Sequence, residues 1–75
     1  MFSRESFSHR LKSLRTSRNI KQKELGLAIG IAEGAISNLE NGKRSPSIEV
    51  ATALADFFDV SLDYLVGRSD DPRRR

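Results

Sequence analysis

The chain has 75 residues, a formal net charge of +3 and no cysteine. A chain of this length holds a single hydrophobic core, so every function it carries must share one small domain. Without cysteine, disulfides and cysteine-ligated zinc sites are excluded, which agrees with a reducing cytoplasm. Residues 1–10 lack the apolar segment of a signal peptide, and the apolar stretch 27–32 is too short to cross a bilayer. We therefore expect a cytoplasmic location and no membrane partner.

Charges are distributed unevenly along the chain. Within residues 1–23, Glu5 is the single acid among the basic residues Arg4, Arg10, Lys12, Arg15, Arg18, Lys21 and Lys23. Within residues 49–71, Arg68 alone opposes the acids Glu49, Asp56, Asp59, Asp63, Asp70 and Asp71. This asymmetry is typical of a protein that presents one face to a polyanion. Charges on a solvated helical surface would explain the same composition.

Five helical segments follow from hydrophobic spacing and from residues that end helices. Phe7, Leu11 and Leu14 recur at i, i+4 and i+7, which predicts an amphipathic first helix. We expect this helix to begin near Ser3 and to end near Arg18. Because no strand pattern competes along the chain, the predicted fold class is all-α.

A second and a third helix are predicted on either side of a short turn. Leu25 and Ile29 share one face of the second helix, and Gly30 ends it because glycine readily adopts the left-handed conformation of a helix end. The third helix has Ile36 and Leu39 on its buried side and ends at an Asn-Gly pair. Only three residues are left for the turn between the two helices.

The fourth helix is predicted to start with Ser45 or Ser47 as its N-cap. Its buried face consists of residues spaced by three or four positions: Ile48, Ala51, Leu54, Ala55 and Phe58. Ser61 is expected to cap a last helical turn. We divide the chain into a domain over residues 1–68 and a flexible basic tail over residues 69–75, because the tail contains no apolar residue.

The two central helices, the glycine-containing turn between them and the basic loop that follows have the spacing of a helix-turn-helix. The residues that carry a family resemblance are Gln22, Glu24, Leu25, Ile29, Gly30, Ile31, Ile36, Ser37, Leu39, Glu40, Asn41, Gly42, Lys43, Arg44, Pro46 and Ser47. Together with residues 7–15 and 60–68, they make the chain resemble the phage repressor and Cro-like family. The resemblance implies a five-helix repressor-like fold that binds double-stranded DNA.

The third helix is the expected recognition helix, because the major groove of DNA admits one α-helix whose first residues face the base edges. Its outward positions are Glu33, Gly34, Ser37, Asn38 and Asn41. The resemblance places Gln22 at a DNA phosphate and makes Lys43 and Arg44 a clamp on the DNA backbone. Ordinary surface residues of a helix and a loop would also explain these three side chains. Lys23 is a further expected DNA-binding residue.

The resemblance also implies a partly buried ion pair between Arg10 and Glu40 that ties the first helix to the third. His9 has no second ligand nearby in the sequence, so we expect it to face solvent, and we expect no metal site and no cofactor. A homodimer contact is expected at the last helix, through Leu62, Tyr64, Leu65 and Val66. The aromatic residues of this acidic part of the chain fit a core or an interface better than a base-stacking platform.

The start of the recognition helix departs from the family pattern. The family commonly has Ser or Thr at the position of Ala32, and the missing cap oxygen typically costs about 1 kcal/mol of helix stability. Glu33 carries a carboxylate that DNA phosphates repel, and the one base contact open to it is to accept a hydrogen bond from a cytosine amine. Alternatively, it only complements the helix dipole. Gly34 offers no side chain to a base. Lys21 at the cap of the second helix and Gly26 within that helix are further departures.

Two functions from different classes compete. The first is a sequence-specific transcriptional regulator, expected to be a repressor, that binds DNA as a homodimer with half-sites about one helical turn (~34 Å) apart. The second is an antitoxin-like or accessory protein-interaction module with weak DNA binding. An enzyme is not expected, because the sequence has no nucleophile with a paired base, no metal-ligand spacing and no phosphate-cradling glycine loop. No small-molecule ligand is indicated.

Overall fold

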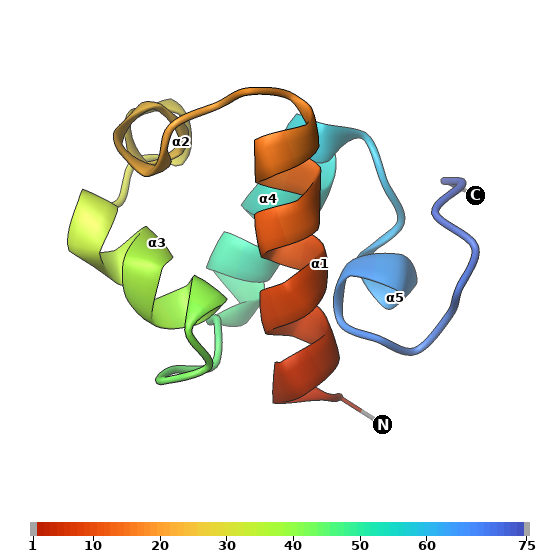
Figure 1. Cartoon of the computed structure of the whole chain (residues 1–75). Helices are drawn as coiled ribbons and strands as arrows, with labels where there is room; N and C mark the ends of the chain where they lie inside the picture. Colours follow the sequence, from red (N-terminus) through yellow and green to blue (C-terminus); the bar gives the residue numbers. More distant parts are fainter. Residues whose placement is uncertain (1, 75) are drawn as a thin grey trace.

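The computed structural model describes residues 2–74. Within that range the chain forms five helices and no strand: α1 (Arg4–Ser17), α2 (Gln22–Ile29), α3 (Glu33–Glu40), α4 (Ile48–Phe58) and α5 (Leu62–Leu65). The predicted all-α fold with five helices is therefore confirmed. In Figure 1, α1 runs through the middle of the molecule, with α2 and α3 on one side and α5 and the chain end on the other.

Serine side chains cap the starts of three helices, and a glycine ends α2. The predicted caps Ser47 and Ser61 are confirmed, because each hydroxyl oxygen accepts from the backbone N–H three residues later. Ser3 caps α1 in the same way. Gly30 ends α2 with φ of +84°, a conformation in which a residue with a side chain is strained.

The hydrophobic core lies where the five helices meet. Its members are buried apolar side chains from every helix and from the segment after α4: Phe7, Leu11, Leu25, Ile36, Leu39, Leu54, Ala55, Phe58, Val60 and Leu65. The expectation that Ile48 belongs to the buried face of α4 is wrong, because Ile48 is 68% exposed. It is the first residue of the helix, and the buried face of α4 begins one turn later, at Ala51.

Residues 69–74, called the C-terminal arm below, lie against α5 and α4 without helix or strand. The N–H of Ser61 donates to the carbonyl of Pro72 at 2.9 Å. Arg74 donates to the carbonyl of Ala55 at 3.2 Å and pairs with Asp56 at 2.7 Å. The tail was expected to be flexible, but in the structure it docks through contacts to Ser61, Ala55 and Asp56, whose positions next to the tail depend on the folded chain. Residue 75 lies outside the described residues.

Candidate nucleic-acid interface

The turn between α2 and α3 is tight because a glycine lies beneath it. The N–H groups of Gly30 and Ile31 both donate to the carbonyl of Gly26, at 2.8 and 2.9 Å. A Cβ atom at Gly26 would lie 2.5 Å from the carbonyl oxygen of Ile31, closer than real Cβ contacts allow. Gly26 was expected only to weaken α2. The structure adds that it lets the turn approach the helix, which fixes where α3 begins.

Helix α3, the expected recognition helix, has one buried and one accessible side. Ile36 and Leu39 are fully or nearly fully buried. On the other side the predicted positions are exposed or half-buried: Glu33, Gly34, Ser37, Asn38 and Asn41. The missing cap at Ala32 is confirmed, since no side-chain hydrogen bond satisfies the first turn. The accessible edge of α3 therefore carries one carboxylate, at Glu33, and otherwise small and amide side chains.

The end of α3 directs the chain into the basic loop. Asn41 donates through its side-chain amide to the hydroxyl of Ser37 at 3.3 Å. The backbone N–H of Lys43 donates to the carbonyl of Asn38 at 3.0 Å. Gly42 has φ of +72°, a turn that residues with side chains rarely adopt. This turn places the loop residues Lys43 and Arg44 directly after the accessible edge of α3.

Glu40 anchors α3 through a buried ion pair with Arg15. The Glu40 side chain is 2% exposed, and Arg15 donates to both of its carboxylate oxygens, Nε to Oε2 at 2.5 Å and Nη2 to Oε1 at 3.0 Å. Hydrogen bonding to Glu40 raises the pKa of the Arg15 guanidinium above its ordinary value. Arg15 is therefore charged throughout the ordinary pH range.

The expected partner of Glu40 was Arg10, and that expectation is wrong. Arg10 and Arg15 are five positions apart on α1, so their side chains leave the helix about 140° apart. Ser8 marks the side of α1 that faces α3, because its hydroxyl donates to the carbonyl of Leu39 at 2.7 Å. Arg15 lies seven positions after Ser8 and so points the same way.

Arg10 instead joins α1 to α5 and the C-terminal arm. Its guanidinium lies 4.3 Å from the centre of the Tyr64 ring. It donates to the backbone carbonyls of Tyr64 and Ser69 and pairs with Asp70 at 2.6 Å. Arg10 thus belongs to the opposite side of α1 from α3.

Gln22, the first residue of α2, is tied to the same carboxylate as Arg15. Its amide nitrogen donates to Oε1 of Glu40 at 3.0 Å. One amide hydrogen and the amide oxygen remain for another partner. Lys23 is exposed beside it. The start of α2 is thereby held against the end of α3, the two places at which DNA contacts were expected.

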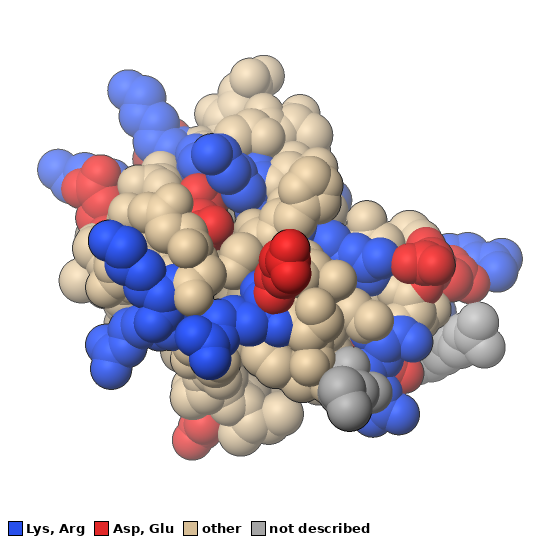
Figure 2. Space-filling view, turned by 60° about the horizontal axis from the view of Figure 1, so that its bottom comes forward, with Lys and Arg blue, Asp and Glu red and all other residues tan. Residues whose placement is uncertain are grey.

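Lys43 and Arg44 are both exposed, and within the described range neither forms an ion pair. Arg4, at the start of α1, reaches the same loop and donates to the carbonyl of Gly42 at 3.4 Å. Figure 2 brings this end of the molecule forward and shows lysine and arginine side chains gathered along one part of the surface. The region after α3 is therefore electropositive.

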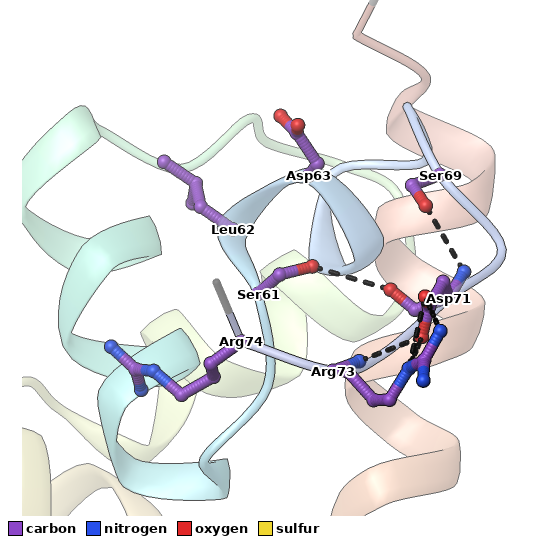
Figure 3. Close-up of a pocket in the computed structure, with 7 residues that line it drawn as sticks. All are labelled: Ser61, Leu62, Asp63, Ser69, Asp71, Arg73 and Arg74. Atoms are coloured by element: carbon purple, nitrogen blue, oxygen red, sulfur yellow. Dashed lines mark hydrogen bonds and ion pairs between the residues drawn. The ribbon is translucent and has the colours of Figure 1, made fainter.

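The expected dimer contact on α5 is only partly accessible. Leu65 is 0% exposed and belongs to the core, so its expected place at a subunit contact is wrong for this conformation. Leu62, Tyr64 and Val66 are half-buried. Figure 3 shows Leu62 beside a cavity of about 470 Å³ between α5 and the C-terminal arm, which Arg73 lines from the other side.

No helix in the described part of the chain is both long and apolar enough to traverse a membrane. Residues 2–74 also bring no three His, Asp or Glu side chains together in a way that would hold a metal ion.

A family model described as helix-turn-helix matches residues 11–65, from the second half of α1 to the end of α5. The chain belongs to this helix-turn-helix family.

Curated relatives of this helix-turn-helix chain are named as regulators. It is 33% identical over 66 residues to the uncharacterized HTH-type transcriptional regulator YobD of Bacillus subtilis, covering 88% of this chain and 59% of YobD. It is 33% identical over 64 residues to the cryptic phage CTXphi transcriptional repressor RstR of Vibrio cholerae, covering 85% of this chain and 58% of RstR. The chain thus spans little more than half the length of these relatives.

Solved helix-turn-helix structures share the fold. The P22 c2 repressor, solved in complex with a synthetic operator, has a TM-score of 0.79 and 30% identity, covering 84% of this chain and 96% of that one. The restriction-modification controller protein C.AhdI of Aeromonas hydrophila has a TM-score of 0.76 and 27% identity, covering 83% and 94%. The expected repressor-like fold and the expected family are therefore confirmed.

Proposed function

We propose that the protein is a transcriptional regulator that binds duplex DNA with α3 in the major groove. The observation that carries this proposal is the accessible edge of α3, with half-buried Ser37 and Asn38, directly followed by the unpaired cations Lys43 and Arg44. Base edges and phosphates need these two kinds of group side by side. The similarity to repressors such as P22 c2 and RstR supports repression as the outcome.

Asn38 is the side chain we assign to base reading. An asparagine amide offers a donor and an acceptor together, the pair that adenine presents in the major groove. Ser37 and Asn41 are hydrogen-bonded to each other and add polar groups at the same edge. Glu33 accepts from a cytosine amine in this arrangement, and Gly34 lets the helix approach the groove closely.

The phosphate contacts are assigned to both ends of the helix-turn-helix. Lys43 and Arg44 bind the DNA backbone after α3, and Gln22 binds it at the start of α2 by donating the amide hydrogen that Glu40 leaves unused. Lys23 adds a cation at the same end. These contacts set affinity and register, whereas the base edges set sequence preference.

A homodimer is the proposed binding unit. One domain of this size offers few contacts, and two domains about one DNA turn apart (~34 Å) convert weak half-site binding into useful affinity. The subunit contact is assigned to the half-buried residues Leu62, Tyr64 and Val66. Gene regulation places the protein in the compartment that holds the DNA.

The salt dependence of DNA binding tests the phosphate assignment. Each phosphate contact contributes a slope of about −0.9 to a plot of log affinity against log salt. Replacing Lys43 and Arg44 together by glutamine should flatten the slope by about 1.8 for every duplex sequence, measured by fluorescence anisotropy. Arg73→Gln, in the C-terminal arm across α1 from the loop, is the matched control (Figure 1). An unchanged slope in the double variant would contradict the assignment.

A second candidate is an antitoxin-like interaction module. The chain is 35% identical over 57 residues to the antitoxin PezA of Streptococcus pneumoniae, covering 76% of this chain and 36% of PezA. The uncapped start of α3 and the bare Gly34 fit a weaker DNA surface. Absence of duplex binding even at low salt would favour this candidate over the regulator.

A further inference from the structure

Arg4 lies beside the basic loop although 38 positions separate it from Gly42. Its Nη1 atom donates to the carbonyl of Gly42 at 3.4 Å, and the residue is exposed. The hydrophobic pattern of α1 gives Arg4 no role, because it precedes the first core residue, Phe7. Only the folded chain places it next to Lys43 and Arg44.

The start of α1 is held firmly in place. Ser3 caps the helix, and its backbone N–H donates to the carbonyl of Val66 at 3.2 Å. One turn further along, the hydroxyl of Ser8 donates to the carbonyl of Leu39 at 2.7 Å. These bonds fix α1 to the ends of both α5 and α3. Arg4 is therefore presented by a positioned helix end rather than by a free segment.

The guanidinium of Arg4 has unused binding capacity. It carries five N–H donors, of which the contact with Gly42 uses one. Within residues 2–74 it forms no ion pair, and its sequence neighbour Glu5 does not pair with it. By contrast, Arg10 and Arg15 each bind a carboxylate. Arg4, Lys43 and Arg44 thus form a cluster of three unpaired cations, called the loop cluster below.

An anion relieves the mutual repulsion within such a cluster, and arginine matches the geometry of phosphate oxygens with two parallel donors. We propose that Arg4 binds a backbone phosphate of the operator, next to the phosphates bound by Lys43 and Arg44. This proposal rests on the proposed function and deepens it, because it extends the DNA contact surface from the helix-turn-helix to the start of α1. A phosphate contact adds affinity without changing which sequence is preferred.

The test compares three variants on one duplex selected by the wild-type chain. Arg4→Gln removes the charge, Arg4→Lys keeps it, and Arg73→Gln removes the same charge from the C-terminal arm. Affinity is measured by anisotropy from 50 to 200 mM salt, and thermal unfolding checks each fold. Arg4→Gln should flatten the slope by about 0.9. The ratio of wild-type affinity to Arg4→Gln affinity should therefore fall about 3.5-fold between the lowest and the highest salt. Arg4→Lys and Arg73→Gln should keep the wild-type slope.

The outcomes separate this inference from the proposed function. If the wild-type chain binds duplex DNA and Arg4→Gln has the wild-type slope, the phosphate contact is overturned while the regulator proposal stands. If Arg4→Lys, which keeps the charge, flattens the slope as much as Arg4→Gln, the positive charge at this position is not what sets the slope, which also overturns the phosphate contact. If the wild-type chain binds no duplex at 50 mM salt, the proposed function itself fails.

Discussion

Glu40 shows how one buried side chain sets the position of a functional surface. Its carboxylate accepts from Arg15 on α1 and from Gln22 on α2, and it is itself the last residue of α3. A carboxylate this deeply buried is tolerated only when hydrogen-bonded and paired. The network therefore fixes the start of α2 and the end of α3 relative to α1. The two expected phosphate-binding regions are held in place with them.

Removing Arg15 tests this network. Arg15→Leu leaves the buried Glu40 without its charged partner, so we expect a loss of about 3 kcal/mol in the free energy of unfolding. In a domain of this size, that lowers the melting temperature by about 12 °C or more. The control Lys12→Leu, at an exposed position of the same helix, should change stability by less than about 0.5 kcal/mol.

The double variant Arg15→Leu, Glu40→Leu separates pairing from packing. Because no carboxylate is then buried alone, part of the stability lost in Arg15→Leu should return. Chemical denaturation of the wild type, both single variants and the double variant gives the four free energies of unfolding that a double-mutant cycle needs. A single variant as stable as the wild type would show that the ion pair does not hold the helices in register.

At the scale of elements, helix positions follow from local chemistry that a sequence displays. The spacing of Phe7 and Leu11, the serine caps and the left-handed Gly30 each act within one or two turns of a helix. Sequence reasoning recovers such features well. It also indicated the accessible edge of α3, because that edge is simply opposite the buried Ile36 and Leu39.

Contacts between elements far apart in the chain could not be predicted from the sequence. The choice of Arg15 over Arg10 depends on which side of α1 faces α3, and Ser8 reveals that side only once its bond to Leu39 is known. The docking of the C-terminal arm depends on backbone carbonyls. Arg4 joins the loop cluster across 38 positions. The seven-residue spacing from Ser8 to Arg15, which puts both on one side of α1, was the one sequence signal that favoured Arg15 as the partner of Glu40.

Two glycines on the helix-turn-helix should respond oppositely to alanine. A Cβ at Gly34 meets no atom within 4 Å, so Gly34→Ala should raise the free energy of unfolding by about 0.5–1 kcal/mol through helix propensity alone. A Cβ at Gly30 also meets no atom within 4 Å, but the φ of +84° strains an alanine, so Gly30→Ala should lower the free energy of unfolding by about 1 kcal/mol. Thermal unfolding of both variants measures the difference. Equal shifts in the same direction would contradict the role assigned to the left-handed turn.

At the scale of the whole molecule, opposite sides of α1 carry different tasks. Figure 1 places α2 and α3 on one side and α5 with the C-terminal arm on the other. On the first side, the loop cluster has no carboxylate partners within residues 2–74. On the second, Arg10 and Arg74 are paired with Asp70 and Asp56. The loop cluster thereby leaves unpaired positive charge beside α3, where the proposed DNA contact lies.

The most direct test of the account is selection of bound sequences from a random pool of DNA duplexes at low salt. The wild-type chain should enrich duplexes with two related half-sites about 10 base pairs apart. Asn38→Ala should change the base preference at one position of each half-site and leave the other positions as they were. A pool that the wild-type chain leaves unenriched, or an Asn38→Ala pool identical to the wild-type pool, would contradict base reading by α3.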